Sequence, residues 1–137
     1  MPFRQGFIAL CEESLKSFDH QGSFVSDITL SGIVHPSILT HLAVVVTDTW
    51  YVLVANRHFD GLSENSSISL HGIDGTHHSS YAMPKGAQVT AMCPSESKFG
   101  KVNETEVLTV VGSSDGVIRF LLFDLRTPSK LVRWFSV

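Results

Sequence analysis

The chain has 137 residues, of which 43% are hydrophobic and 17% are charged. This length corresponds to one domain, and the apolar fraction excludes a generic disordered tail, which lacks the side chains for a core. The formal net charge of −3 argues against non-specific binding to nucleic acid or to an anionic membrane, because both need a surplus of positive charge.

Residues that favour extended backbone are abundant, with fifteen Val, seven Ile and nine Thr, and eighteen Ser and ten Gly can supply turns. The composition therefore predicts a mostly β protein. Cys11 and Cys93 are far apart in the sequence and lie beside apolar residues, so we expect two buried thiols. The apolar run 7–10 is too short for a signal peptide, and we expect a cytoplasmic or nuclear protein.

Near the start of the chain, residues 12–18 are expected to form a loop or a single helical turn, since this segment is short and runs into turn-forming residues. After it, short β-type runs alternate with turn residues. Strands are predicted at residues 24–30, 39–47, 50–55 and 67–73. The stretch 76–80, rich in His and Ser, is expected to be a solvated polar loop.

The second half of the chain repeats this order with clearer signals. Strands are predicted at residues 88–93, 106–111, 117–123 and 130–135, joined antiparallel. Corresponding strands of the two halves are roughly 50 residues apart, a spacing typical of the four-stranded blades of a β-propeller. A single small sheet cannot cover both of its apolar faces, and it becomes stable when neighbouring sheets do so.

Residues 107–126 resemble a blade of the WD-repeat family. An apolar strand leads into the hairpin Gly112-Ser113-Ser114-Asp115-Gly116, and a β-branched strand with Arg119 follows it. The resemblance covers about one blade well, and residues 39–83 share only the order of the strands.

The resemblance to the WD-repeat pattern is incomplete at several positions. Phe123-Asp124 stands where the family has Trp-Asp, and Gly86-Ala87 stands where it has Gly-His. Of the polar residues that form the internal hydrogen-bond network of a typical blade, only Asp115 keeps its place. We therefore expect degenerate blades in which that network is incomplete.

The sequence thus predicts an all-β chain made of antiparallel four-stranded blades, forming a partial or degenerate WD-repeat β-propeller. A small β-sandwich or barrel is the alternative. Residues 1–38 are expected to be the remnant of a preceding blade, 39–87 a degenerate blade and 88–137 a WD-repeat-like blade. Closed propellers use four to eight blades, whereas this chain has room for about three, so we expect it to act within a larger assembly.

The segment 112–116 also matches the Gly-x-Ser-x-Gly nucleophile elbow of hydrolases, which requires a helix after the serine. The β-branched residues that follow favour a hairpin instead. Gly112, Asp115 and Gly116 are therefore predicted as structural turn residues, with a type I′ turn that gives Gly116 a positive φ. We further expect the Asp115 carboxylate to accept hydrogen bonds from backbone N–H groups in or near the turn.

Three histidines, His71, His77 and His78, lie close together in the sequence, with Asp74 between them. On a strand, the adjacent His77 and His78 would point to opposite faces, and the spacing does not match that of a zinc site. We therefore predict no metal, no cofactor and no catalytic residue. The alternative is a ligand- or metal-binding sandwich or barrel that uses this segment, or a hydrolase that uses the 112–116 turn.

A basic cluster near the end of the chain comprises Arg119, Arg126, Lys130 and Arg133, and together with Trp134 it is a candidate interaction surface. The WD-repeat resemblance implies a non-catalytic scaffold for protein–protein interaction within a larger complex. The expected partners are other proteins or further propeller blades, and self-association is also expected.

Overall fold

The computed structural model describes residues 6–11, 14–33, 37–46, 50–61, 63–94, 106–124 and 131–136. These residues form strands and turns and contain no helix, so the all-β prediction is confirmed for this part of the chain. Accordingly, no described segment forms a helix long and apolar enough to cross a membrane.

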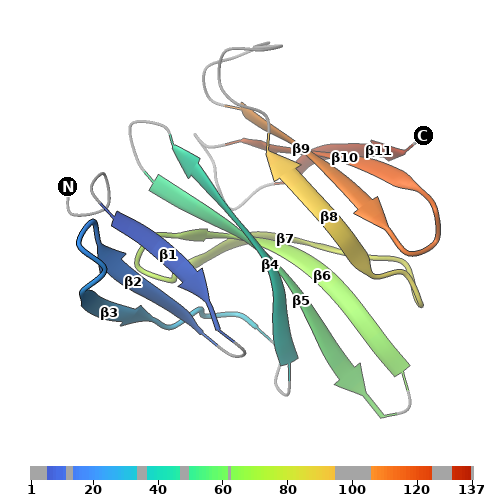
Figure 1. Ribbon diagram of the computed structural model, residues 1–137. Helices are drawn as coiled ribbons and strands as arrows, with labels where there is room; N and C mark the ends of the chain where they lie inside the picture. The colour runs from blue at the N-terminus through green and yellow to red at the C-terminus, as the bar shows by residue number, and fades with distance from the viewer. Residues whose placement is uncertain are drawn as a thin grey trace.

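The described residues form eleven strands in three separate antiparallel sheets (Figure 1). The first contains β1 (Gly6–Leu10), β2 (Leu15–Asp19) and β3 (Phe24–Ile28). The second contains β4 (Ser37–Val46), β5 (Trp50–Asp60), β6 (Ser63–Gly72) and β7 (His77–Ala82). The third contains β8 (Val89–Pro94), β9 (Glu106–Ser113), β10 (Ile118–Asp124) and β11 (Leu131–Ser136).

Within each sheet, every strand pairs with the next strand of the sequence, so all three sheets have simple up-and-down order. The four antiparallel strands predicted in the second half of the chain are confirmed as β8 to β11. Strands β4, β5 and β6 hold the same positions in their sheet as β8, β9 and β10 in theirs, as the repeat comparison predicted.

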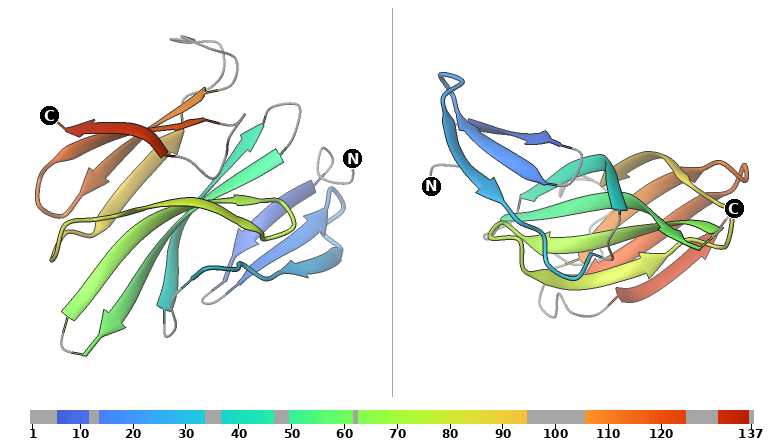
Figure 2. Two further views of the ribbon diagram at one scale, coloured as in Figure 1. Left: turned by 180° about the vertical axis from the view of Figure 1, so that it is seen from behind. Right: turned by 90° about the horizontal axis from the view of Figure 1, so that it is seen from below.

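The β4–β7 sheet lies between the other two sheets and is buried on both faces (Figures 1 and 2). Strand β5 shows why: Val52 and Val54 point to one face, Leu53 and Ala55 point to the other, and all four side chains are 0% exposed. Because successive residues of a strand alternate between faces, two faces of apolar side chains need a covering layer on each side.

Two apolar clusters fill the spaces between the layers. On one side, Val52 and Val54 pack with Leu15 and Ile28 of the β1–β3 sheet. On the other side, residues of the middle sheet pack against the third sheet, and this larger cluster is formed by Val45, Leu53, Ala55, Ile68, Leu70, Tyr81, Met83, Ala87, Val89, Val107, Val111, Leu121 and Phe123. The architecture is therefore a stack of three sheets with two apolar interfaces.

The first strands of the three sheets lie next to one another in the stack. Strand β4 contacts β1 on one side and β8 on the other. The contact between β4 and β8 includes a hydrogen bond in which Nε2 of His41 lies 3.1 Å from the carbonyl oxygen of Thr90.

Two sequence predictions about local structure are wrong. Part of the segment 12–18, expected as a loop or helical turn, belongs to β2, where Leu15 and Ser17 are buried against the stack. The polar stretch 76–80, expected as a solvated loop, is largely strand β7, in which Ser79 and Tyr81 are buried. Both strands are short and carry few apolar residues, so their burial depends on partners that are distant in sequence.

The expectation of two buried thiols is also wrong. Cys93 is exposed, because it lies on the face of β8 that points away from the middle sheet, and Cys11 is only partly buried.

Candidate functional site

The most densely connected polar site lies at the turn between β9 and β10. Gly112 pairs with Ile118 across the hairpin, and the N–H of Gly116 donates to the carbonyl oxygen of Ser113 at 3.0 Å. The φ of Gly116 is 79°, which confirms the predicted positive value. The predicted type I′ turn is wrong, because such a turn needs a positive φ at both central residues, and no described residue other than glycine has one.

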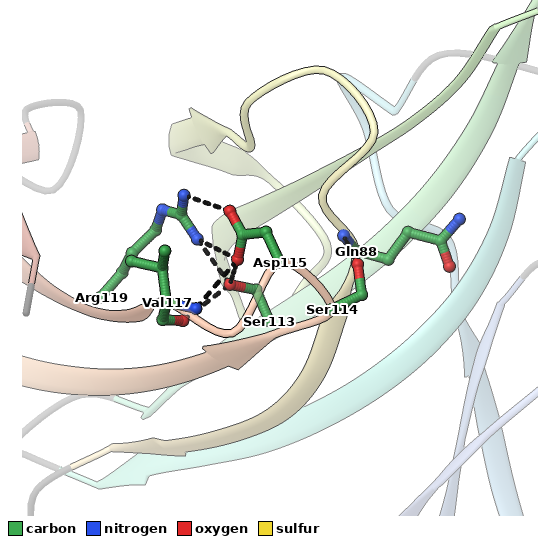
Figure 3. Close-up of polar contacts among 6 residues, drawn as sticks. All are labelled: Gln88, Ser113, Ser114, Asp115, Val117 and Arg119. Atoms are coloured by element: carbon green, nitrogen blue, oxygen red, sulfur yellow. Dashed lines mark hydrogen bonds and ion pairs between the residues drawn. The ribbon is translucent and has the colours of Figure 1, made fainter.

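Asp115 is the centre of this network (Figure 3). Its Oδ1 accepts a hydrogen bond from the N–H of Val117 at 3.1 Å, which confirms the expected backbone contact. The Ser113 hydroxyl lies 2.5 Å from the same oxygen and 2.8 Å from the carbonyl oxygen of Val117. Arg119 donates to both carboxylate oxygens, at 2.8 Å to Oδ2 and at 3.2 Å to Oδ1, and also to Ser113 Oγ at 2.5 Å.

Arg119 is only 5% exposed, because it lies on the face of β10 that packs against the middle sheet. The expectation that it belongs to an interaction surface is therefore wrong. The guanidinium is within the fold, and its hydrogen bonds to Asp115 raise the pKa of Arg119. The same bonds, with that from Ser113, hold the pKa of Asp115 well below its usual value.

This arrangement compensates a buried positive charge locally. A guanidinium removed from water needs a partner of opposite charge with good geometry, and Asp115 supplies it four residues earlier in the chain. Ser113, Asp115 and Arg119 together form this polar network.

Ser114, the serine of the Gly-x-Ser-x-Gly pattern, has a structural role in the same turn (Figure 3). Its N–H donates to the carbonyl oxygen of Gln88 at 2.8 Å, and its Oγ accepts from the N–H of Gln88 at 2.8 Å. These two bonds hold the start of β8 beside the turn. Strand β10 follows the turn where a nucleophile elbow requires a helix, so the predicted hairpin is confirmed.

A second polar cluster surrounds His71, whose side chain is 0% exposed. Its Nδ1 lies 3.4 Å from the carbonyl oxygen of Gly75, and its Nε2 lies 2.7 Å from Ser69 Oγ. Because a carbonyl can only accept, Nδ1 carries the proton and Nε2 accepts from Ser69. Burial is the main cause that lowers the pKa of His71 to about 4.

Hydrogen bonds also join this cluster to the segment that follows β3. The carbonyl oxygen of Gly75 accepts from the N–H of Ser31 at 2.9 Å, and Ser31 Oγ accepts from the N–H of His77 at 2.9 Å. A Cβ added at Gly32 would lie 2.8 Å from the His77 ring, so the chain passes closely over that ring.

The remaining histidines do not assemble into a metal site among the residues that the structure describes. His77 packs edge-on against His71, with ring centroids 5.5 Å apart, whereas His78 contacts Tyr51 at 5.8 Å. The two adjacent histidines thus have different surroundings. No group of three or more His, Cys, Asp or Glu side chains in the described ranges could hold a metal ion.

The other four residues of the predicted interaction surface lie outside the described residues or on β11. Arg126 and Lys130 lie outside the described residues, and Arg133 and Trp134 lie on β11, of which only the backbone is described. Sequence reasoning missed the roles of Ser113, Gln88 and Ser31. For Ser113, the available signal was its spacing from Asp115 and Arg119 across a predicted turn. Gln88 acts through its backbone, and Ser31 through its backbone N–H and its hydroxyl, toward residues that are distant in sequence and leave no local pattern.

Comparison of the chain with protein-family models, with curated protein sequences and with solved structures finds no match.

The Asp115 network predicts a difference between two aspartates that cap turns in the same way. Asp74 Oδ1 accepts from the N–H of Thr76 at 3.0 Å, much as Asp115 does from Val117, but Asp74 forms no ion pair with a buried cation among the described residues. We expect Asp115→Ala to lower Tm roughly two to three times as far as Asp74→Ala, because it leaves the Arg119 charge buried and uncompensated. Thermal melts followed by circular dichroism measure both values.

The double variant Asp115→Ala/Arg119→Met should regain part of the loss in Tm, since no buried charge remains in it. Equal melts for Asp115→Ala and Asp74→Ala would contradict the role assigned to the ion pair.

The buried His71 predicts a dependence of stability on pH. Its pKa is about 4 in the folded protein, against an ordinary value of 6.5, so the unfolded chain binds the extra proton more readily between these values. The stabilising contribution is complete above pH 6.5 and is lost as the pH falls toward 4, by up to about 3 kcal/mol. Urea unfolding of the wild type and of His71→Gln at several pH values tests this. The same pH dependence in both proteins would show that another group is responsible.

Proposed function

We propose that the chain is a non-catalytic scaffold for protein–protein interaction, built from three consecutive sheets of a degenerate WD-repeat-like β-propeller. The observation that carries the proposal is the directional stack: each sheet runs up and down in sequence order, and the first strands β1, β4 and β8 lie side by side. In propellers, consecutive sheets pack face to face around a common centre in this way.

The Asp115 network supports this proposal because it makes the β9–β10 hairpin rigid. Ser113, Asp115 and Arg119 join the two strands of the hairpin, and Ser114 joins the hairpin to β8. A hairpin fixed on both sides can present its neighbouring loops to a partner with little loss of conformational entropy.

We place the partner-binding surface at the basic C-terminal cluster, without the buried Arg119. It comprises Arg126, Lys130 and Arg133, and arginine is one of the residue types that often dominate the binding energy of protein interfaces. Strand β11, which carries Arg133, is one of the two edge strands of the third sheet. The excess of basic side chains suits a partner with an acidic surface.

The test uses the full chain with an affinity tag in its native cells, and it quantifies proteins that copurify in stoichiometric amounts. We expect at least one such partner, and we expect its recovery to fall about tenfold with Lys130→Glu/Arg133→Glu, since rim charge reversal weakens association. Lys85→Glu is the charge control, because Lys85 is exposed in the turn before β8 and is not part of the basic cluster.

Equal recovery with both variants would contradict the proposed surface, and absence of any stoichiometric partner would contradict the scaffold function. Stoichiometric zinc or copper in the purified chain would favour the alternative of a metal-binding protein.

A further inference from the structure

The two outer sheets of the stack each expose a broad apolar face. On the first sheet, Ile8 and Leu10 point toward the middle sheet, so Phe7 on the same strand points outward. Phe7 stacks on Phe18 with ring centroids 5.4 Å apart, and Phe18 meets Phe24 edge-on at 6.0 Å. These three rings, one from each strand, form what we call the aromatic face.

The aromatic face also carries one ion pair. Lys16 and Asp27 lie on it, with side chains 41% and 54% exposed and a distance of 2.6 Å between Nζ and Oδ1. Lys16 also lies over the ring of Phe24, 5.5 Å from its centroid. Phe7 and Phe24 remain 52% and 55% exposed, so large apolar surfaces face solvent.

The outer face of the third sheet exposes aliphatic side chains, and we call it the aliphatic face. Val107 and Val111 point to the middle sheet, so Val110 between them points outward, and Ile118 pairs with Gly112 on the same outer side. Val110 and Ile118 are 36% and 46% exposed. The outward positions of the neighbouring strand β8 are Ala91 and Cys93, opposite Gly112 and Val110.

The two outer faces differ in their side chains. The third sheet has small residues at Ala91 and Gly112 beside Val110 and Ile118, whereas the aromatic face carries three rings. Large side chains pack best against small ones. The internal interfaces are also directional, since each sheet offers one face to the sheet before it and the other to the sheet after it.

We propose that a second copy of this chain covers both outer faces, the aromatic face of each copy docking on the aliphatic face of the other. The proposal rests on the propeller-like stacking in the proposed function, because it continues the internal stack in the same direction. Two copies then form a closed ring of six sheets, within the range of four to eight blades that closed propellers use.

The available area explains why two contacts are needed. Each strand of the first sheet has five residues, so the aromatic face measures about 16 Å by 14 Å, or roughly 230 Å². One contact buries about 450 Å² counted on both chains, far below the roughly 1,000 Å² of a specific interface. Two contacts in one ring bury about 900 Å², slightly below that value, and they form cooperatively, since the second forms within an existing pair.

Sedimentation equilibrium of the full chain tests the proposal. We expect the wild type to sediment at twice the 15.0 kDa chain mass. Phe24→Glu on the aromatic face and Ile118→Glu on the aliphatic face should each convert it to a monomer at the same concentration, with Kd raised at least about tenfold. Phe59→Glu is the matched control, because Phe59 is 49% exposed on β5 of the middle sheet, and it should remain a dimer.

Circular dichroism verifies that each variant is folded, and Phe7→Ser and Ala91→Glu provide a second pair if either first variant unfolds. A monomeric wild type would overturn the proposal, as would an assembly larger than two chains. Dissociation by only one of the two face variants would also overturn it, since it would show that identical faces pair with each other.

This result is independent of the test of the scaffold function. If the wild type is a monomer but still captures a partner that Lys130→Glu/Arg133→Glu loses, only the second-copy proposal fails. If the wild type is a dimer but no stoichiometric partner copurifies with it, only the proposed function fails.

Discussion

The burial of the β4–β7 sheet on both faces is the constraint on which the rest of the structure depends. Strand β5 carries four consecutive apolar residues, 52–55, that are fully buried although they alternate between opposite faces. At about 25 cal/mol for each Å² of apolar surface removed from water, neither face can remain uncovered without a large loss of stability. The positions of the β1–β3 and β8–β11 sheets follow from this requirement.

The two polar clusters fix the covering sheets at the ends of their strands. The Asp115–Arg119 pair and the bonds between Ser114 and Gln88 fix the β9–β10 hairpin and the start of β8. On the opposite side of the middle sheet, the carbonyl of Gly75 holds the chain that leaves β3. Apolar burial thus holds the three layers together, whereas the polar contacts fix the β9–β10 hairpin, the start of β8 and the chain after β3.

The strongly apolar runs were the part of the fold that sequence could predict, because their residue types and length exclude other structures. The run 42–46 and the strands of the second half were assigned correctly for this reason. Strand β7 could not be predicted, because its polar residues are buried only through neighbours that are distant in sequence. Asp115 was placed in its turn correctly, but the burial of Arg119 depends on the middle sheet, which no local pattern reveals.

The most direct test of the two-sided burial is the thiol reactivity of consecutive cysteines on β5. Leu53→Cys and Val54→Cys would be made in a chain with both native cysteines replaced by Ser, and the exposed Cys93 of the wild type would serve as the reference. In the native protein, a stack of three sheets predicts that both new thiols react far more slowly than Cys93. If either one reacts as fast as Cys93, one face of the middle sheet is open to solvent and the three-layer account is wrong.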